Sequence, residues 1–145
     1  MNTYVDSSVL LRVILGEPDR LTTWTRISTP VSSELIRLEC LRTIDRARVR
    51  LHLNDEAIAT RRSAALEMID SLRLVSIDRL VLERAAEPFP TSIGSLDAIH
   101  LASALFAREQ MQDLVLATHD AELGLAARAV GFTVHGLAST HKLNP

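Results

Sequence analysis

The stretch TYVDSSVLLRVIL, residues 3–15, changes its pattern after three residues. Thr3–Val5 has the β-branched and aromatic side chains of a short strand, whereas the residues from Ser8 onward have the apolar spacing of a helix. Asp6 lies between the two patterns. The order recurs in VLATHDAELGLA, residues 115–126, where Asp120 separates a strand from a helix. Repeated passages of this kind predict an α/β protein with a mostly parallel sheet.

The same alternation extends along the rest of the chain. The expected strands are Thr3–Val5, Pro30–Ser32, Arg73–Ile77, Leu114–Thr118 and Thr133–Gly136. The expected helices are Ser8–Leu15, Asp19–Arg26, Ser33–Arg46, Asp55–Leu72, Arg79–Glu87, Leu96–Glu109 and Ala121–Val130. Pro88–Ser95, which contains two prolines and a glycine, is expected to be a mobile connection. Since there is no linker or repeat, we expect a single domain over residues 1–145.

Composition restricts how this chain could bind nucleic acid. Its 16 basic and 18 acidic residues give a net charge of -2, so bulk positive charge cannot supply the affinity. If four of the acids bound a metal ion, the net charge of the remaining residues would be +2 instead of -2. A near-neutral total can therefore conceal an acidic cleft. Aromatic stacking platforms are disfavoured, because the chain has only five aromatic residues: Tyr4, Trp24, Phe89, Phe106 and Phe132.

The cysteine count and the N-terminus bear on the compartment. Cys40 is the only cysteine, which excludes an internal disulfide and a cysteine-based zinc site, and we expect it to be a buried thiol. The N-terminus has no basic lead-in, and Asp6 and Arg12 interrupt its apolar part, so neither a signal peptide nor a membrane span is expected. We therefore expect a soluble, cytoplasmic protein.

Three acids fall where a parallel sheet binds its ligands, outside the carboxyl ends of the strands. Asp6 and Asp120 each follow a strand, and Asp97 opens the helix after Ser95. If the first and fourth strands are neighbours, Asp6 and Asp120 face each other across the crevice. Glu39 lies in mid-helix on the apolar side, where an unpartnered carboxylate would be costly.

Each acid also has a structural interpretation. Asp6 and Asp120 are good helix N-cap residues, and Asp97 suits the first turn of a helix. Glu34 has the same first-turn explanation and is left as structural. Glu39 is neither a cap nor in the first turn, so it needs a cation, a donor or a polar cleft. Taken singly, the capping interpretation is the better one for the aspartates.

The acids together predict more than any one of them. Oxygen ligands without paired histidines or cysteines suit Mg²⁺ or Mn²⁺ rather than zinc. Clustered carboxylates repel one another, so at least one should have a raised pKa without metal. The pattern predicts a divalent-metal site suited to phosphate chemistry.

At these positions the sequence resembles PIN-domain nucleases, specifically the VapC-like ribonuclease toxins of toxin–antitoxin pairs. The resemblance covers almost the whole chain and is carried by YVDSSVL (4–10), SELIRLE (33–39), LDAIHLASA (96–104) and ATHD (117–120). It implies a three-layer α/β/α fold around a mostly parallel sheet of about five strands. The family's four acids fall on Asp6, Glu39, Asp97 and Asp120, and its auxiliary hydroxyls fall on Ser7 and Thr118. Leu123 replaces a frequent aromatic residue, and Glu122 is a weaker auxiliary candidate.

The resemblance implies an endoribonuclease that uses Mg²⁺ or Mn²⁺ to hydrolyse RNA phosphodiester bonds. It also implies a toxin that inhibits growth or translation, a cognate antitoxin and a homodimer, with no sequence-specific DNA binding unless the antitoxin is present. Some arginines on and beyond the Glu39 helix are expected to guide RNA, from the set Arg37, Arg42, Arg46, Arg48 and Arg50. For His100 and His119 a surface or packing role is favoured, because oxygen-ligand chemistry needs neither.

Three other classes of protein share parts of the pattern. A phosphoacceptor signalling domain also places Asp and Thr at strand ends, but it uses a lysine near its last strand, and the only lysine here is Lys142 in the tail. A haloacid-dehalogenase-type phosphatase would need a second aspartate where Ser8 stands. A PIN-fold protein that binds RNA without cleaving it is the non-enzymatic alternative, and retention of all four acids counts against it.

Overall fold

A five-stranded parallel sheet organises the computed structural model, which describes residues 1–138. Its strands are β1 (Asn2–Val5), β2 (Thr29–Ser33), β3 (Arg73–Val75), β4 (Val115–Ala117) and β5 (Val134–His135). They lie in the order β3-β2-β1-β4-β5, and every neighbouring pair is parallel. Val5 of β1 is in register with Ala117 of β4, so the predicted adjacency of these strands is confirmed. Lys142 lies outside the described residues.

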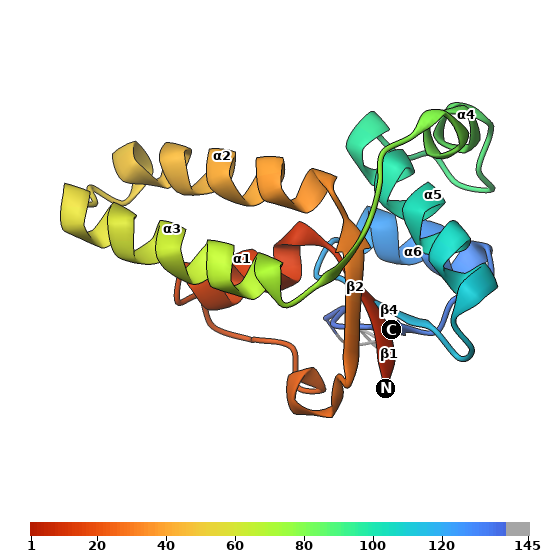
Figure 1. Cartoon of the computed structure of the whole chain (residues 1–145), viewed down its shortest axis with the longest axis horizontal. Coiled ribbons are helices and arrows are strands. Elements are labelled where there is room, and N and C mark those ends of the chain that lie inside the picture. Colours follow the sequence, from red (N-terminus) through yellow and green to blue (C-terminus); the bar gives the residue numbers. More distant parts are fainter. Residues whose placement is uncertain (139–145) are drawn as a thin grey trace, which may run out of the picture.

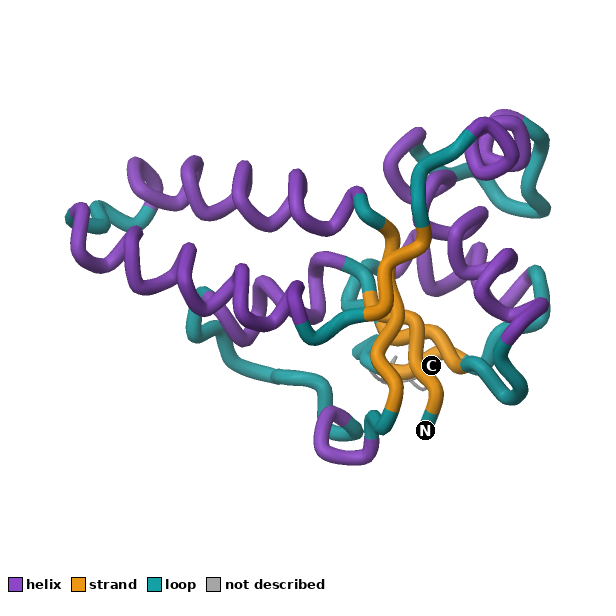
Figure 2. The backbone as a smooth tube through the Cα atoms, viewed as in Figure 1, coloured by secondary structure: helices purple, strands orange, loops and turns teal. Residues whose placement is uncertain are grey.

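Helices cover both faces of the sheet, which confirms the three-layer α/β/α architecture (Figure 1). One layer contains α1 (Ser7–Ile14), α2 (Leu35–Arg50) and α3 (Asp55–Asp70). The other contains α4 (Arg79–Ala86), α5 (Ser95–Gln110) and α6 (Ala121–Ala129). Figure 2 shows α2 and α3 as an antiparallel pair that extends well beyond the edge of the sheet.

The central strand contributes to a separate apolar core on each face of the sheet. Val5 packs in a cluster with α1, α2 and α3, whereas Tyr4 packs in a second cluster with α5 and α6. Successive side chains of a strand point to opposite faces, which explains the division. Cys40 is fully buried in the first cluster, as expected, and burial raises the pKa of its thiol to about 12. Leu123 is fully buried in the second, consistent with a packing role.

The predicted helix Asp19–Arg26 is wrong. The structure has only a short 3₁₀ helix, Trp24–Arg26, after an irregular loop. Asp19, the first residue of the predicted helix, has a φ of 58°, which a right-handed helix does not allow. Among residues 1–138, none of the helices is long and apolar enough to cross a membrane.

Several element boundaries also differ from expectation. The helix predicted from Ser33 begins at Leu35, because Ser33 ends β2 and its hydroxyl accepts the Leu35 N–H. That helix continues to Arg50 rather than Arg46. The predicted strands 73–77, 114–118 and 133–136 are each shorter, ending at Val75, Ala117 and His135. In the last case Gly136 ends the strand with a φ of 96°. Pro88–Ser95 connects α4 to α5 as a loop whose last residue begins α5, and its mobility stays a prediction.

Candidate active site

Asp6 lies at the carboxyl end of β1, where it caps the N-terminus of α1 and is almost fully buried. Its Oδ1 accepts hydrogen bonds from the Ser8 backbone N–H at 3.1 Å and from the Ser8 hydroxyl at 2.6 Å. Its Oδ2 accepts from the Thr118 hydroxyl at 2.8 Å. Burial raises the pKa of Asp6 in spite of these donors. The capping interpretation therefore describes Asp6 correctly, yet the carboxyl group is also held in a buried polar setting.

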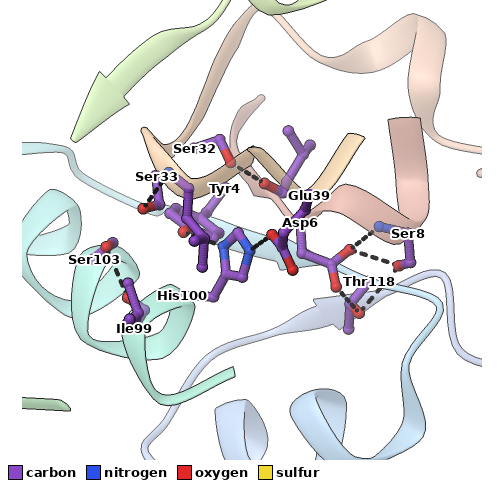
Figure 3. Close-up of polar contacts among 12 residues, drawn as sticks. Tyr4, Asp6, Ser8, Ser32, Ser33, Glu39, Ile99, His100, Ser103 and Thr118 are labelled. Carbon is purple, nitrogen blue, oxygen red and sulfur yellow. Dashed lines mark hydrogen bonds and ion pairs between the residues drawn. The ribbon is translucent and has the colours of Figure 1, made fainter. Parts of the chain in front are cut away.

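Ser8 and Thr118 join the end of β1 to the end of β4 (Figure 3). The Thr118 hydroxyl donates to Asp6 and accepts the backbone N–H of Asp120 at 2.9 Å. The Ser8 hydroxyl donates to Asp6 and accepts the backbone N–H of His119 at 2.9 Å. Each hydroxyl therefore donates to Asp6 after β1 and accepts a backbone N–H from the residues after β4. These bonds fix Asp6 relative to Asp120.

Three carboxylates gather beyond the end of β4. Asp97, Asp120 and Glu122 each offer an oxygen, and these oxygens all lie within 4.8 Å of one another. Asp120 also caps α6 through a 3.1 Å bond from the Leu123 N–H to Oδ1, whereas Asp97 is half-buried in the first turn of α5. Desolvation and the nearby charges of Asp120 and Asp6 raise the pKa of Asp97 to about 6. The raised pKa expected of a metal-free acidic cluster therefore falls on Asp97 and Asp6.

Glu39 reaches the same region from α2, where His100 of α5 holds it. His100 Nε2 lies 2.5 Å from Glu39 Oε1, and His100 Nδ1 lies 2.8 Å from the Tyr4 hydroxyl (Figure 3). Because a carboxylate only accepts, Nε2–H donates to Glu39, and in the neutral ring Nδ1 accepts from Tyr4. Burial lowers the pKa of His100, but the hydrogen bond and charge of Glu39 outweigh it and raise the pKa overall. Tyr4 and His100 are both almost completely buried.

The four predicted acids are electrostatically coupled, since the charges of Asp6, Glu39 and Asp120 all act on the pKa of Asp97. Among residues 1–138, however, the acids whose oxygens lie within 4.8 Å of one another are Asp97, Asp120 and Glu122. Their ligand atoms are all carboxylate oxygens, and burial together with the charges of Asp120, Asp6 and Glu39 disfavours the charged form of Asp97. This chemistry fits a divalent cation such as Mg²⁺, which prefers oxygen ligands and offsets clustered negative charge.

Two side chains of this site, Ser8 and His100, were not predicted from the sequence. The resemblance pointed to Ser7, but within residues 1–138 the hydroxyls that bond Asp6 belong to Ser8 and Thr118. His100 was expected on the surface or in packing, and the structure buries it against Glu39. Its spacing of one helical turn from Asp97 was the available signal.

The structure keeps two further residues in the roles expected for them. His119 Nδ1–H donates to the Gly136 carbonyl at 2.8 Å, which fits a packing role. Glu34 lies at the start of α2, and its carboxylate accepts the Ile77 N–H at 3.4 Å, which fits a structural role.

With this geometry established, comparisons with known proteins identify the family. The PIN domain model matches residues 3–129, and the chain belongs to the PIN-domain family. Ribonuclease VapC46 from Mycobacterium tuberculosis is 33% identical over 134 residues, covering 90% of this chain and 94% of that protein. Ribonuclease VapC47 from the same species is 29% identical over 136 residues, covering 89% and 92%. The chain is thus VapC-like over nearly its full length.

A solved structure shares the fold at lower sequence identity. PAE2754 from Pyrobaculum aerophilum superposes with a TM-score of 0.59 and 21% identity, covering 92% of this chain and 83% of that one. At this identity the likeness supports the fold alone.

Proposed function

We propose that this protein is a divalent-metal-dependent endoribonuclease and the toxin of a toxin–antitoxin pair. The observation that carries the proposal is the convergence of carboxylates at the ends of β1 and β4. Asp97 and Asp120 have oxygens within 4.8 Å of each other and of Glu122, and the charge of Asp6 acts on Asp97. Membership of the PIN-domain family and similarity to two proteins named as ribonucleases support the choice of RNA as substrate.

Asp6, Glu39, Asp97 and Asp120 would hold Mg²⁺ or Mn²⁺, directly or through water, with Glu122 as an additional ligand. A bound ion of this kind polarises a phosphate group and lowers the pKa of bound water. The chain supplies the positioning. Ser8 and Thr118 fix the Asp6 carboxylate, and their bonds to the backbone after β4 keep Asp120 beside it.

Glu39 is suited to a different task from the aspartates. Its hydrogen bond with His100 engages Oε1, so Oε2 remains available to accept a proton or a hydrogen bond from water. The side chain is 17% exposed, so water reaches it. We assign to Glu39 the orientation of the attacking water, or a contact with the metal through water.

The competing classes find less support. A phosphoacceptor domain needs a reactive aspartate, but in this chain both oxygens of Asp6 already accept hydrogen bonds from Ser8 and Thr118. A PIN-fold protein that binds RNA without cleaving it would not need five clustered acids at one end of the sheet. The assignment as a metal-dependent nuclease explains both the raised pKa of Asp97 and the hydrogen bonds that fix Asp6.

The test is cleavage of single-stranded RNA by the purified full-length protein. We expect cleavage with Mg²⁺ or Mn²⁺ and none with EDTA. Asp6→Asn and Asp97→Asn should abolish cleavage while thermal denaturation shows that the fold remains. Cleavage that continues unchanged in both variants excludes this site, and a stable phosphorylated aspartate without cleavage supports the signalling alternative.

The biological role is proposed on the same basis. We expect a cytoplasmic protein that arrests growth when it is expressed alone and is relieved by a small antitoxin that covers the site. Size-exclusion chromatography with light scattering tests the proposed homodimer. Growth unaffected by the active protein would contradict the toxin assignment without affecting the nuclease assignment.

A further inference from the structure

A groove runs along one face of α2 and begins at the acidic site. It has a volume of about 340 Å³ and lies between α2 and the first turns of α1 and α5. Glu39 and Ser7 line the end nearest the acids, and Leu96, which precedes Asp97, lines one wall. Arg42, Thr43 and Arg46 continue the lining along α2, together with Leu35 and Leu38. A molecule in this groove therefore lies next to the proposed catalytic residues.

The spacing of residues on α2 separates the arginines into two groups. Arg42 and Arg46 follow Glu39 by three and seven residues, so all three share one face of the helix. Arg37 is turned from Arg42 by about 140° and from Arg46 by about 180°, at roughly 100° per residue. Arg48 lies about three helical turns after Arg37, so it projects from nearly the same face of the helix. It pairs with Asp55 at the start of α3. Arg42 and Arg46 line the groove and Arg37 and Arg48 do not.

The two groove arginines have only weak local partners. Arg42 pairs with Asp45 at 3.2 Å, but these side chains are 59% and 54% exposed. Exposed pairs of this type contribute little to stability, so a phosphate can replace Asp45 at little cost. Arg46 donates to the Thr43 hydroxyl at 3.1 Å, which leaves its charge without a carboxylate partner among residues 1–138. Both guanidinium groups are therefore free to bind an anion.

We propose that this groove binds the backbone of single-stranded RNA, with Arg42 and Arg46 contacting phosphates that flank the scissile bond. The proposal rests on the proposed nuclease function and extends it by assigning the path of the substrate. Guanidinium groups bind phosphate oxygens in a bidentate manner, which suits this task. Leu38 and Leu96 are 59% and 51% exposed, and they offer apolar contact to sugars and unstacked bases. Positive charge beside an acidic catalytic site complements a chain of phosphates.

The experiment measures RNA binding separately from cleavage. All variants are made in full-length Asp97→Asn protein, and affinity for a fluorescein-labelled single-stranded oligoribonucleotide is measured by anisotropy in Mg²⁺ over a range of salt. Arg42→Gln/Arg46→Gln removes two charges from the groove. The matched control, Arg37→Gln/Arg48→Gln, removes two charges from the same helix outside the groove. Thermal denaturation checks that both double variants fold.

We expect the groove variant to bind RNA at least tenfold more weakly than its parent, and the control to bind within twofold of it. The slope of log affinity against log salt should fall by about 1.4 for the groove variant, at about 0.7 for each lost phosphate contact with a single strand. An equal loss in both variants would show that bulk charge acts instead of the groove. Unchanged binding in the groove variant would overturn the proposal and leave a protein partner as the occupant.

The outcome is distinguishable from failure of the nuclease assignment. If the unmodified protein does not cleave RNA but the two double variants differ as expected, the groove assignment stands and the nuclease assignment fails. If the protein cleaves RNA but the double variants bind RNA equally, the groove assignment fails alone.

Discussion

His100 Nε2 donates to Glu39 Oε1 across 2.5 Å, although the two residues are 61 positions apart in the sequence. The pair joins α5 to α2, and the Tyr4 hydroxyl at 2.8 Å fixes the other side of the imidazole ring. His100 is 1% exposed and Glu39 is 17% exposed, so the histidine is the buried support and the carboxylate is the group that meets solvent. His100 is therefore a positioning residue for Glu39.

Replacing His100 should lower activity according to the donor that remains. His100→Leu removes the donor to Glu39, and we expect the single-turnover cleavage rate or the Mg²⁺ affinity to fall about 10- to 100-fold, as for other residues that orient metal ligands. His100→Gln can place an amide N–H near the position of Nε2 and should restore part of this loss. Equal losses in both folded variants would contradict the positioning role.

Ser8 should matter more than Ser7. Ser8→Ala removes the 2.6 Å bond to Asp6 and the acceptor for the His119 N–H, so we expect Mg²⁺ affinity to fall about tenfold. Ser7→Ala is the matched neighbour, and it leaves every bond to Asp6 in place. Half-saturating Mg²⁺ concentrations for cleavage measure both. A larger effect of Ser7→Ala would show that the bound metal reorganises these hydroxyls.

Asp97 should make the metal-free protein less stable as pH rises. Its pKa is raised from 3.8 to about 6, so the folded state binds this proton more tightly than the unfolded state does. Stability relative to Asp97→Asn should therefore fall as pH rises from about 4 to about 6 and stay lower above that range. Thermal denaturation in EDTA measures the difference, and Mg²⁺ should reverse it at neutral pH. A difference that is independent of pH would contradict the raised pKa.

Glu122 should contribute to metal binding. Its oxygen lies within 4.8 Å of those of Asp97 and Asp120, so Glu122→Gln should weaken Mn²⁺ binding measured by calorimetry. Glu109→Gln removes an exposed acid near the far end of α5 and serves as the control. We expect at least a threefold loss for Glu122→Gln and none for the control. Equal affinities would restrict the site to the four acids predicted from sequence.

The sequence predicted the positions of the acids because those positions follow from local pattern. Asp6 and Asp120 each mark a change from strand to helix spacing, and parallel pairing of β1 and β4 then places them at one edge of the sheet. Asp97 could be located in the same way, at the start of a helix. The helix predicted for Asp19–Arg26 was wrong because Asp19 has a left-handed backbone and only Trp24–Arg26 forms a helical turn.

The remaining features depend on tertiary geometry. The choice of Ser8 over Ser7 is set by the direction of each side chain at the first turn of α1, and both residues are serine. The contact of His100 with Glu39 requires α5 and α2 to meet across the end of the sheet. The spacing along α2 groups Arg42 and Arg46 with Glu39, but only the packing of Leu96 beside α2 shows that this face lines a groove. No local pattern contains this information.

We propose that RNA cleavage depends on a metal ion held by these carboxylates. The test measures the single-turnover cleavage rate as a function of Mn²⁺ concentration for the unmodified protein, Asp120→Asn and Asp113→Asn. Asp113 precedes β4 and lies at the opposite end of that strand from Asp120, and asparagine tolerates its φ of 54°. We predict that Asp120→Asn loses at least 100-fold in rate or requires far more Mn²⁺, while Asp113→Asn matches the unmodified protein. Identical Mn²⁺ dependence in all three proteins would show that these carboxylates do not hold the metal ion that cleavage requires.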